Sequence, residues 1–106
     1  MNEDRIRNLE QWIKEDPAEP FNKYALALEL SALNPDRASV LFDELLYNHT
    51  DYLPAYYTGG MFFLNRELTD KAMRIFESGI QLAENQNNKK AVKELKAALD
   101  NLKFDL

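Results

Sequence analysis

The residue types that carry most enzyme chemistry are sparse in this chain. Its 106 residues include one histidine, His49, and no cysteine. A structural zinc site takes about four nitrogen, sulfur or oxygen ligands, so an ordinary one cannot be built around a lone imidazole. His49 follows a predicted helix, where a cation is favoured and the ring would cap the helix end or face solvent. We expect no metal, no cofactor and no catalytic histidine.

The acids and the paired glycines also lack a catalytic arrangement. Acids such as Glu10 and Glu15 fall on the surfaces and ends of predicted helices, and no pair at acid–base spacing can be inferred. Gly59 and Gly60 lie inside a predicted helix, without the lysine and serine that follow a phosphate-binding loop. This pair allows close packing of two helices, or a dent for a ligand or a partner's side chain. We predict that the protein is not an enzyme.

Charge and hydropathy exclude several classes of partner. The formal net charge is −5, so no basic stripe is present to displace counterions from nucleic acid. The same sign disfavours anionic membrane surfaces. No apolar run approaches the roughly 20 residues of a membrane span, and the first residues lack the apolar core of a signal peptide. We expect a cytoplasmic protein that binds neither nucleic acid nor membranes.

Helix punctuation and apolar periodicity predict six helices. Asn34 before Pro35 is a typical helix start, Thr69 is the expected N-cap of the fifth helix, and Pro17 closes the first. No stretch alternates with the period of a strand. Short connections require antiparallel neighbours, so an array of helical hairpins is expected. The helices should cover about residues 3–15, 20–33, 35–48, 56–64, 70–83 and 89–103.

These helices recur with a period of about 34 residues, which is typical of arrays whose units bury an apolar face on their neighbours. In one helix of each unit, 34 residues separate Ala38, Phe42 and Leu46 from Ala72, Phe76 and Ile80. In the preceding helix, 35 residues separate Phe21, Tyr24, Ala25 and Leu28 from Tyr56, Gly59, Gly60 and Phe63. These stripes should pack the first helix of each unit on its second, with Ala25 and Gly60 at the contact.

The pattern resembles the tetratricopeptide repeat family, in particular small two-repeat proteins of bacteria. The second unit matches the family's small and aromatic positions closely, whereas the first unit departs at Leu45, where a small residue is usual. The resemblance implies an all-α fold of antiparallel hairpins in a superhelix. It also implies a single domain over residues 1–106, with a half-repeat helix at 1–17, repeats at 18–50 and 51–85, and a capping helix at 86–106.

In such arrays one helix face lines a concave groove where peptides bind, and this resemblance supplies the candidate site. Aromatic and methionine side chains suit such a groove because they offer a large, adaptable contact area. The family's clamp for a peptide carboxylate is absent, because Asn22 and Leu26 occupy its positions. The final helix could instead fold over this face and bury it. The predicted groove residues are Asn22, Leu26, Glu29, Tyr57, Met61 and Leu64.

Two functions follow as hypotheses. The first is a non-catalytic interaction module or scaffold that holds a peptide or helix in the groove. Because the chain is acidic, a basic or neutral segment is favoured over an acidic one. The second is a structural protein whose incomplete repeat ends form a homo-dimer or larger oligomer, with Trp12, Phe104 and Leu106 as contact residues. The lysines of the last helix form either a solvated face or a surface for an acidic partner.

Overall fold

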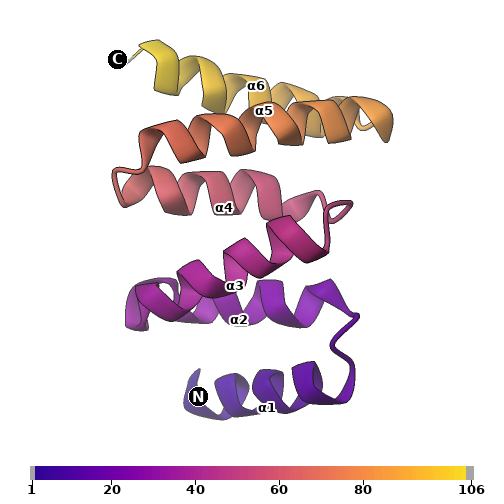
Figure 1. Ribbon diagram of the computed structural model, residues 1–106, viewed down its shortest axis with the longest axis vertical. Helices are drawn as coiled ribbons and strands as arrows, with labels where there is room; N and C mark the ends of the chain where they lie inside the picture. The colour runs from indigo at the N-terminus through magenta and orange to yellow at the C-terminus, as the bar shows by residue number, and fades with distance from the viewer. Residues whose placement is uncertain (1, 105–106) are drawn as a thin grey trace. The chain divides into compact units, whose positions relative to one another are not determined.

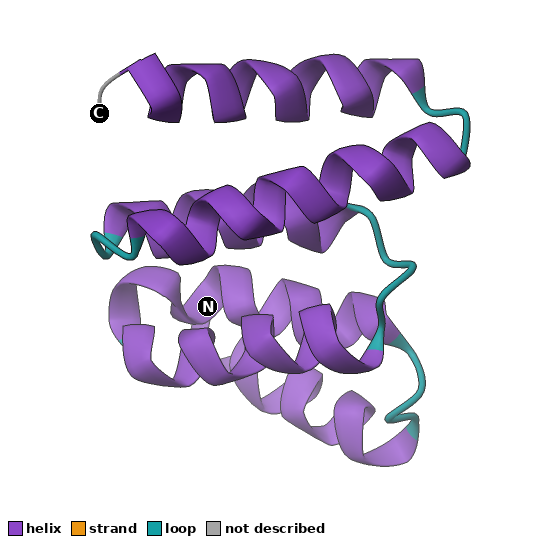
Figure 2. Ribbon diagram, turned by 45° about the horizontal axis from the view of Figure 1, so that its top comes forward, coloured by secondary structure: helices purple, strands orange, loops and turns teal. Residues whose placement is uncertain are grey.

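The computed structural model describes residues 2–104 and consists of α-helices joined by short turns (Figure 2). No strand occurs within that range, so the predicted all-α fold is confirmed. No helix in the same range is long and apolar enough to cross a membrane. The helices are α1 (Asn2–Glu15), α2 (Pro20–Leu33), α3 (Pro35–Asn48), α4 (Pro54–Asn65), α5 (Thr69–Asn85) and α6 (Lys89–Phe104).

The chain divides into two compact units, here called unit 1 (Met1–Tyr52) and unit 2 (Leu53–Leu106). Each unit is an antiparallel hairpin with one further helix (Figure 1). In unit 1 the middle helix α2 packs against α1 and α3, and in unit 2 the middle helix α5 packs against α4 and α6. The division lies beside the predicted repeat boundary at residues 50 and 51. The prediction of one domain over 1–106 stays a prediction.

Proline and asparagine start the helices of the unit 1 hairpin. Pro20 and Pro35 occupy the first turns of α2 and α3, where a backbone N–H has no partner within the helix in any case. Asn34 ends α2 and also caps α3, because its side-chain oxygen accepts a hydrogen bond from the backbone N–H of Arg37 at 3.3 Å. One residue therefore connects two helices, as the sequence predicted.

The turns of unit 2 instead each contain a residue in the left-handed backbone conformation. Glu67 has φ of 65° and Asn87 has φ of 56°. After Glu67, the backbone N–H of Leu68 donates to the carbonyl of Phe63 at 3.0 Å, which satisfies one of the last carbonyls of α4. This closure places Leu68 at the N-cap of α5 and Thr69 inside the helix. The prediction that Thr69 is the N-cap is therefore wrong by one residue.

Glycines let the three helices of unit 2 approach closely. A Cβ on Gly60 would lie 2.8 Å from Cδ1 of the Phe76 ring and closer still to its Cε1. A Cβ on Gly79 would lie 2.7 Å from the Tyr56 Cβ in α4 and 3.2 Å from Cδ1 of Leu95 in α6. Cβ atoms do not approach other atoms below about 3 Å, so both contacts need glycine. The predicted helix contact at Gly60 is confirmed.

The core of unit 1 differs from the predicted stripe on α2. Phe21 and Leu28, expected to face α3, are 53% and 46% exposed. The reason is that α2 has neighbours on two faces, so Leu26 and Leu30 are buried instead. The buried residues of α3 are Ala38, Leu41, Phe42 and Leu45, whereas Leu46 of the predicted stripe is half-buried.

Candidate functional site

The lone histidine contacts a buried lysine in unit 1. Lys23 is 9% exposed, and its Nζ lies 3.3 Å from Nε2 of His49 and 4.0 Å from Oε2 of Glu44. An ammonium group can only donate, so in this contact Nε2 of His49 is the acceptor. The contact joins α2 to the end of α3 and is a structural link. Within residues 2–104, no cluster of histidine and acid side chains could hold a metal ion.

A second contact in unit 1 joins the rings of two tyrosines. The rings of Tyr24 and Tyr52 meet edge to face, with centroids 5.6 Å apart. Burial raises the pKa of the Tyr52 hydroxyl above its ordinary value of 10.0, and the neighbouring Tyr24 and Glu19 raise it further. A raised pKa keeps the Tyr52 hydroxyl protonated at neutral pH, so this group is not activated as a nucleophile. This corner of unit 1 is therefore a packing contact.

Helix α1 covers the part of the predicted groove that lies in unit 1. Leu26 is 1% exposed, which removes it from contact with a partner. Glu29, one turn further along the same face, accepts a hydrogen bond from Nε of Arg5 in α1 at 2.9 Å. Asn22, one turn earlier, is half-buried. The physical reason is the docking of α1, whose Glu10 also pairs with Arg37 of α3 at 2.6 Å.

The corresponding face of unit 2 borders an open groove between α4 and α6. Tyr57, Met61 and Leu64 project from successive turns of α4 into this groove. Its volume is about 610 Å³, within the range of small-ligand sites. Tyr57 is 44% exposed, whereas Met61 and Leu64 are half-buried. The remaining lining residues are Thr69, Glu94, Ala97, Ala98, Asn101 and Leu102.

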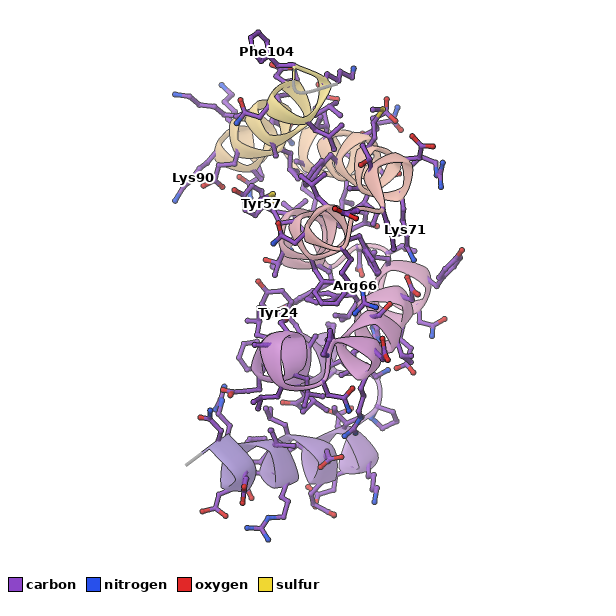
Figure 3. All side chains as sticks on the ribbon, turned by 90° about the vertical axis from the view of Figure 1, so that its left-hand side faces the viewer. Tyr24, Tyr57, Arg66, Lys71, Lys90 and Phe104 are labelled. Carbon is purple, nitrogen blue, oxygen red and sulfur yellow. The ribbon has the colours of Figure 1, made fainter. Side chains whose placement is uncertain are left out.

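Helix α6 borders this groove without burying it. The core residues of α6, such as Leu95 and Leu99, anchor the helix mainly on α5, and α6 touches α4 only slightly. The ring of Tyr57 packs against the ring of Phe76, with their centroids 6.5 Å apart. Figure 3 shows Tyr57 and Lys90 on one side of unit 2 and Lys71 on the opposite side. The alternative that the last helix occludes the face is thus only partly realised.

The α6 wall of the groove was missed by the sequence analysis. Glu94, Ala97 and Asn101 recur three and four residues apart, on a face adjacent to the buried leucines. The signal was present in that spacing, but the helix was interpreted as a solvated cap. Its lysines at 89, 90, 93, 96 and 103 are exposed and do not line the groove.

Two solved structures are similar to this chain over most of its length. A solution NMR structure of a tetratricopeptide repeat domain protein from Salinibacter ruber is 36% identical, with a TM-score of 0.76, over 82% of this chain and 89% of that chain. A crystal structure of a tetratricopeptide repeat domain protein from the same organism is 35% identical, with a TM-score of 0.75, over 80% and 97%. No family model and no curated protein matches the sequence.

Proposed function

Because this chain belongs to the tetratricopeptide repeat family, we propose that it is a non-catalytic module that holds a partner protein in the groove of unit 2. Domains of this family generally mediate protein–protein interactions. The observation that carries the proposal is the open wall formed by Tyr57, Met61 and Leu64 beside α6. Apolar side chains left accessible in a concave site are a feature of binding surfaces.

The contrast between the two units supports unit 2 as the binding part. Leu26 and Met61 occupy equivalent positions, 35 residues apart, yet Leu26 is buried under α1 and Met61 faces the groove. A partner's side chains could replace water over Met61 without displacing a helix. The predicted residues Asn22, Leu26 and Glu29 therefore have no direct contact with the partner in this proposal.

Affinity capture from the native cell, with the bound proteins identified by mass spectrometry, tests the proposal. The double change Tyr57→Ala with Met61→Glu should abolish capture while the helical circular dichroism spectrum is retained. The matched control is Tyr47→Ala with Val40→Glu, since both side chains are exposed on unit 1, at 81% and 56%. Equal capture by the groove variant and the wild type would place the binding surface elsewhere.

Homo-oligomerisation is a second candidate, supported by two exposed aromatic side chains. Trp12 in α1 is 45% exposed and Phe104 in α6 is 90% exposed. Leu106, also expected to take part, lies outside the described residues. Light scattering at several concentrations distinguishes the candidates, because a constant monomer mass would exclude self-association as the main role.

A further inference from the structure

The chemistry of the groove in unit 2 indicates what kind of segment it takes, an inference that rests on the function proposed above. Its length is set by two parallel walls, α4 and α6, both antiparallel to α5 (Figure 1). Tyr57 and Leu64 are seven residues apart, as are Glu94 and Asn101. Seven residues of α-helix rise about 10.5 Å, so the groove is two helical turns long.

The lining of the groove favours an extended occupant over a helical one. An extended chain advances about 3.3 Å per residue, so three to four residues span the groove. A helix satisfies its own backbone hydrogen bonds and would make no use of the polar groups in the lining. An extended chain also leaves backbone N–H and C=O groups that need partners. The side-chain amide of Asn101 and the hydroxyl of Thr69 can donate to and accept from such groups.

The two ends of the groove differ in charge. Because α4 and α6 run parallel, Tyr57 and Glu94 lie toward one end, and Leu64 and Leu102 toward the other. Within residues 2–104, Glu94 is the only acidic or basic residue of the lining, and its carboxylate has no ion-pair partner there. A carboxylate beside an accessible aromatic ring is a favourable environment for a cation. Among the described residues, the lining at the opposite end is uncharged.

We propose that the groove binds an extended internal segment of a partner protein, with a lysine or arginine at the Tyr57–Glu94 end. Apolar side chains two to three residues away lie against Leu64 and Leu102. The basic side chain pairs with the Glu94 carboxylate and packs on the Tyr57 ring. A free C-terminal carboxylate at that end is repelled by Glu94, in keeping with the absence of the carboxylate clamp.

An array of random octapeptides, acetylated and amidated at their ends and probed with the full chain, tests this proposal. Selected peptides should carry lysine or arginine two to three residues from an apolar residue. With Glu94→Lys the selection should change to aspartate or glutamate at that position. Glu77→Lys, an exposed residue of α5 outside the groove, makes the same change in net charge and should leave the selection unchanged.

Three results would overturn the proposal. They are selection without a basic residue, a change of preference that Glu77→Lys reproduces, or no selection at all. Replacing the central residues of a selected peptide by proline, one position at a time, separates the backbone geometries. A helical occupant should lose affinity at every central position, whereas an extended one should lose it only where its backbone N–H has a partner in the groove. A loss of affinity beyond tenfold at every central position would indicate a helical occupant. If the array fails but whole-protein capture still requires Tyr57 and Met61, only this inference falls; if capture is also independent of them, the proposed function falls with it.

Discussion

Units 1 and 2 share a hairpin pattern and differ in which helix of the hairpin receives the third helix. In unit 1 the third helix, α1, packs on the first helix of the hairpin and buries Leu26. In unit 2 the third helix, α6, packs mainly on the second helix, and Met61 stays accessible. The same type of position is thus a core residue in one unit and a groove residue in the other. In such repeats, binding capacity depends on the neighbour of a helix face as much as on its sequence.

The largest expected effect tests this difference directly. Leu26→Ala should lower the free energy of unfolding of unit 1 by about 3 kcal/mol, because it leaves a cavity under α1. Met61→Ala should cost unit 2 less than about 1 kcal/mol, since its side chain is already partly in water. Chemical denaturation measures the total loss of stability, and hydrogen exchange assigns the loss in each variant to unit 1 or unit 2. Equal costs for the two substitutions would contradict the contrast between a covered and an open face.

The second prediction compares the small residue at the helix contact in each unit. Gly60→Ala should destabilise unit 2 by about 2 kcal/mol, because the buried Phe76 ring occupies the space of the new Cβ. This cost outweighs the gain of up to about 1 kcal/mol in helix propensity. The equivalent Ala25→Gly in unit 1 should cost only about 1 kcal/mol, from propensity. A Gly60→Ala variant that melts above the wild type would show that the ring can move aside.

The third prediction concerns the buried lysine that distinguishes unit 1. His49→Ala should destabilise unit 1 by about 1–2 kcal/mol, because Lys23 Nζ loses its 3.3 Å acceptor and keeps only Glu44 at 4.0 Å. Lys23→Met combined with His49→Leu should recover most of this loss, since no buried polar group then lacks a partner. Thermal melts of the single and double variants provide the measurement. Additive losses in the double variant would argue that the two side chains are not coupled.

The smallest effect is expected at high pH. The folded-state pKa of Tyr52 is raised above 10.0, so the folded state holds this proton more tightly than the unfolded state. Its contribution to stability is fully present below pH 10 and is lost as the pH rises through the folded-state pKa. Tyr52→Phe should therefore reduce the fall in stability above pH 10. The exposed Tyr47→Phe serves as control, and identical pH profiles for the two variants would refute the assignment.

The sequence predicted the helices and the glycine contact of unit 2 well because these depend on local chemistry. The Asn34–Pro35 turn and the glycine opposite Phe76 are each specified by a few neighbouring residues. Whether a helix face is covered by another helix depends instead on contacts between helices that are distant in the sequence. Leu26 and Met61 look alike in sequence, and only the docking of α1 or α6 separates them.

The missed α6 wall has a similar cause. Ala97 and Asn101 contribute little hydrophobicity, so periodicity assigns them to solvent. They become part of a site only through the place where α6 lies beside α4. Phe21 shows the opposite error. Its apolar character predicted burial, but the packing of α2 on its two neighbours leaves the side chain exposed.

The position of the single tryptophan gives the molecule a built-in reporter. Trp12 belongs to α1 in unit 1 and is 45% exposed, and no other residue of the chain has an indole ring. Its emission under selective excitation therefore follows the detachment of α1 or the unfolding of unit 1. Occupation of the groove should leave the emission maximum unchanged and alter the tyrosine absorption, to which Tyr57 contributes. One optical experiment can thus separate release of the covering helix from occupation of the open groove, without a label.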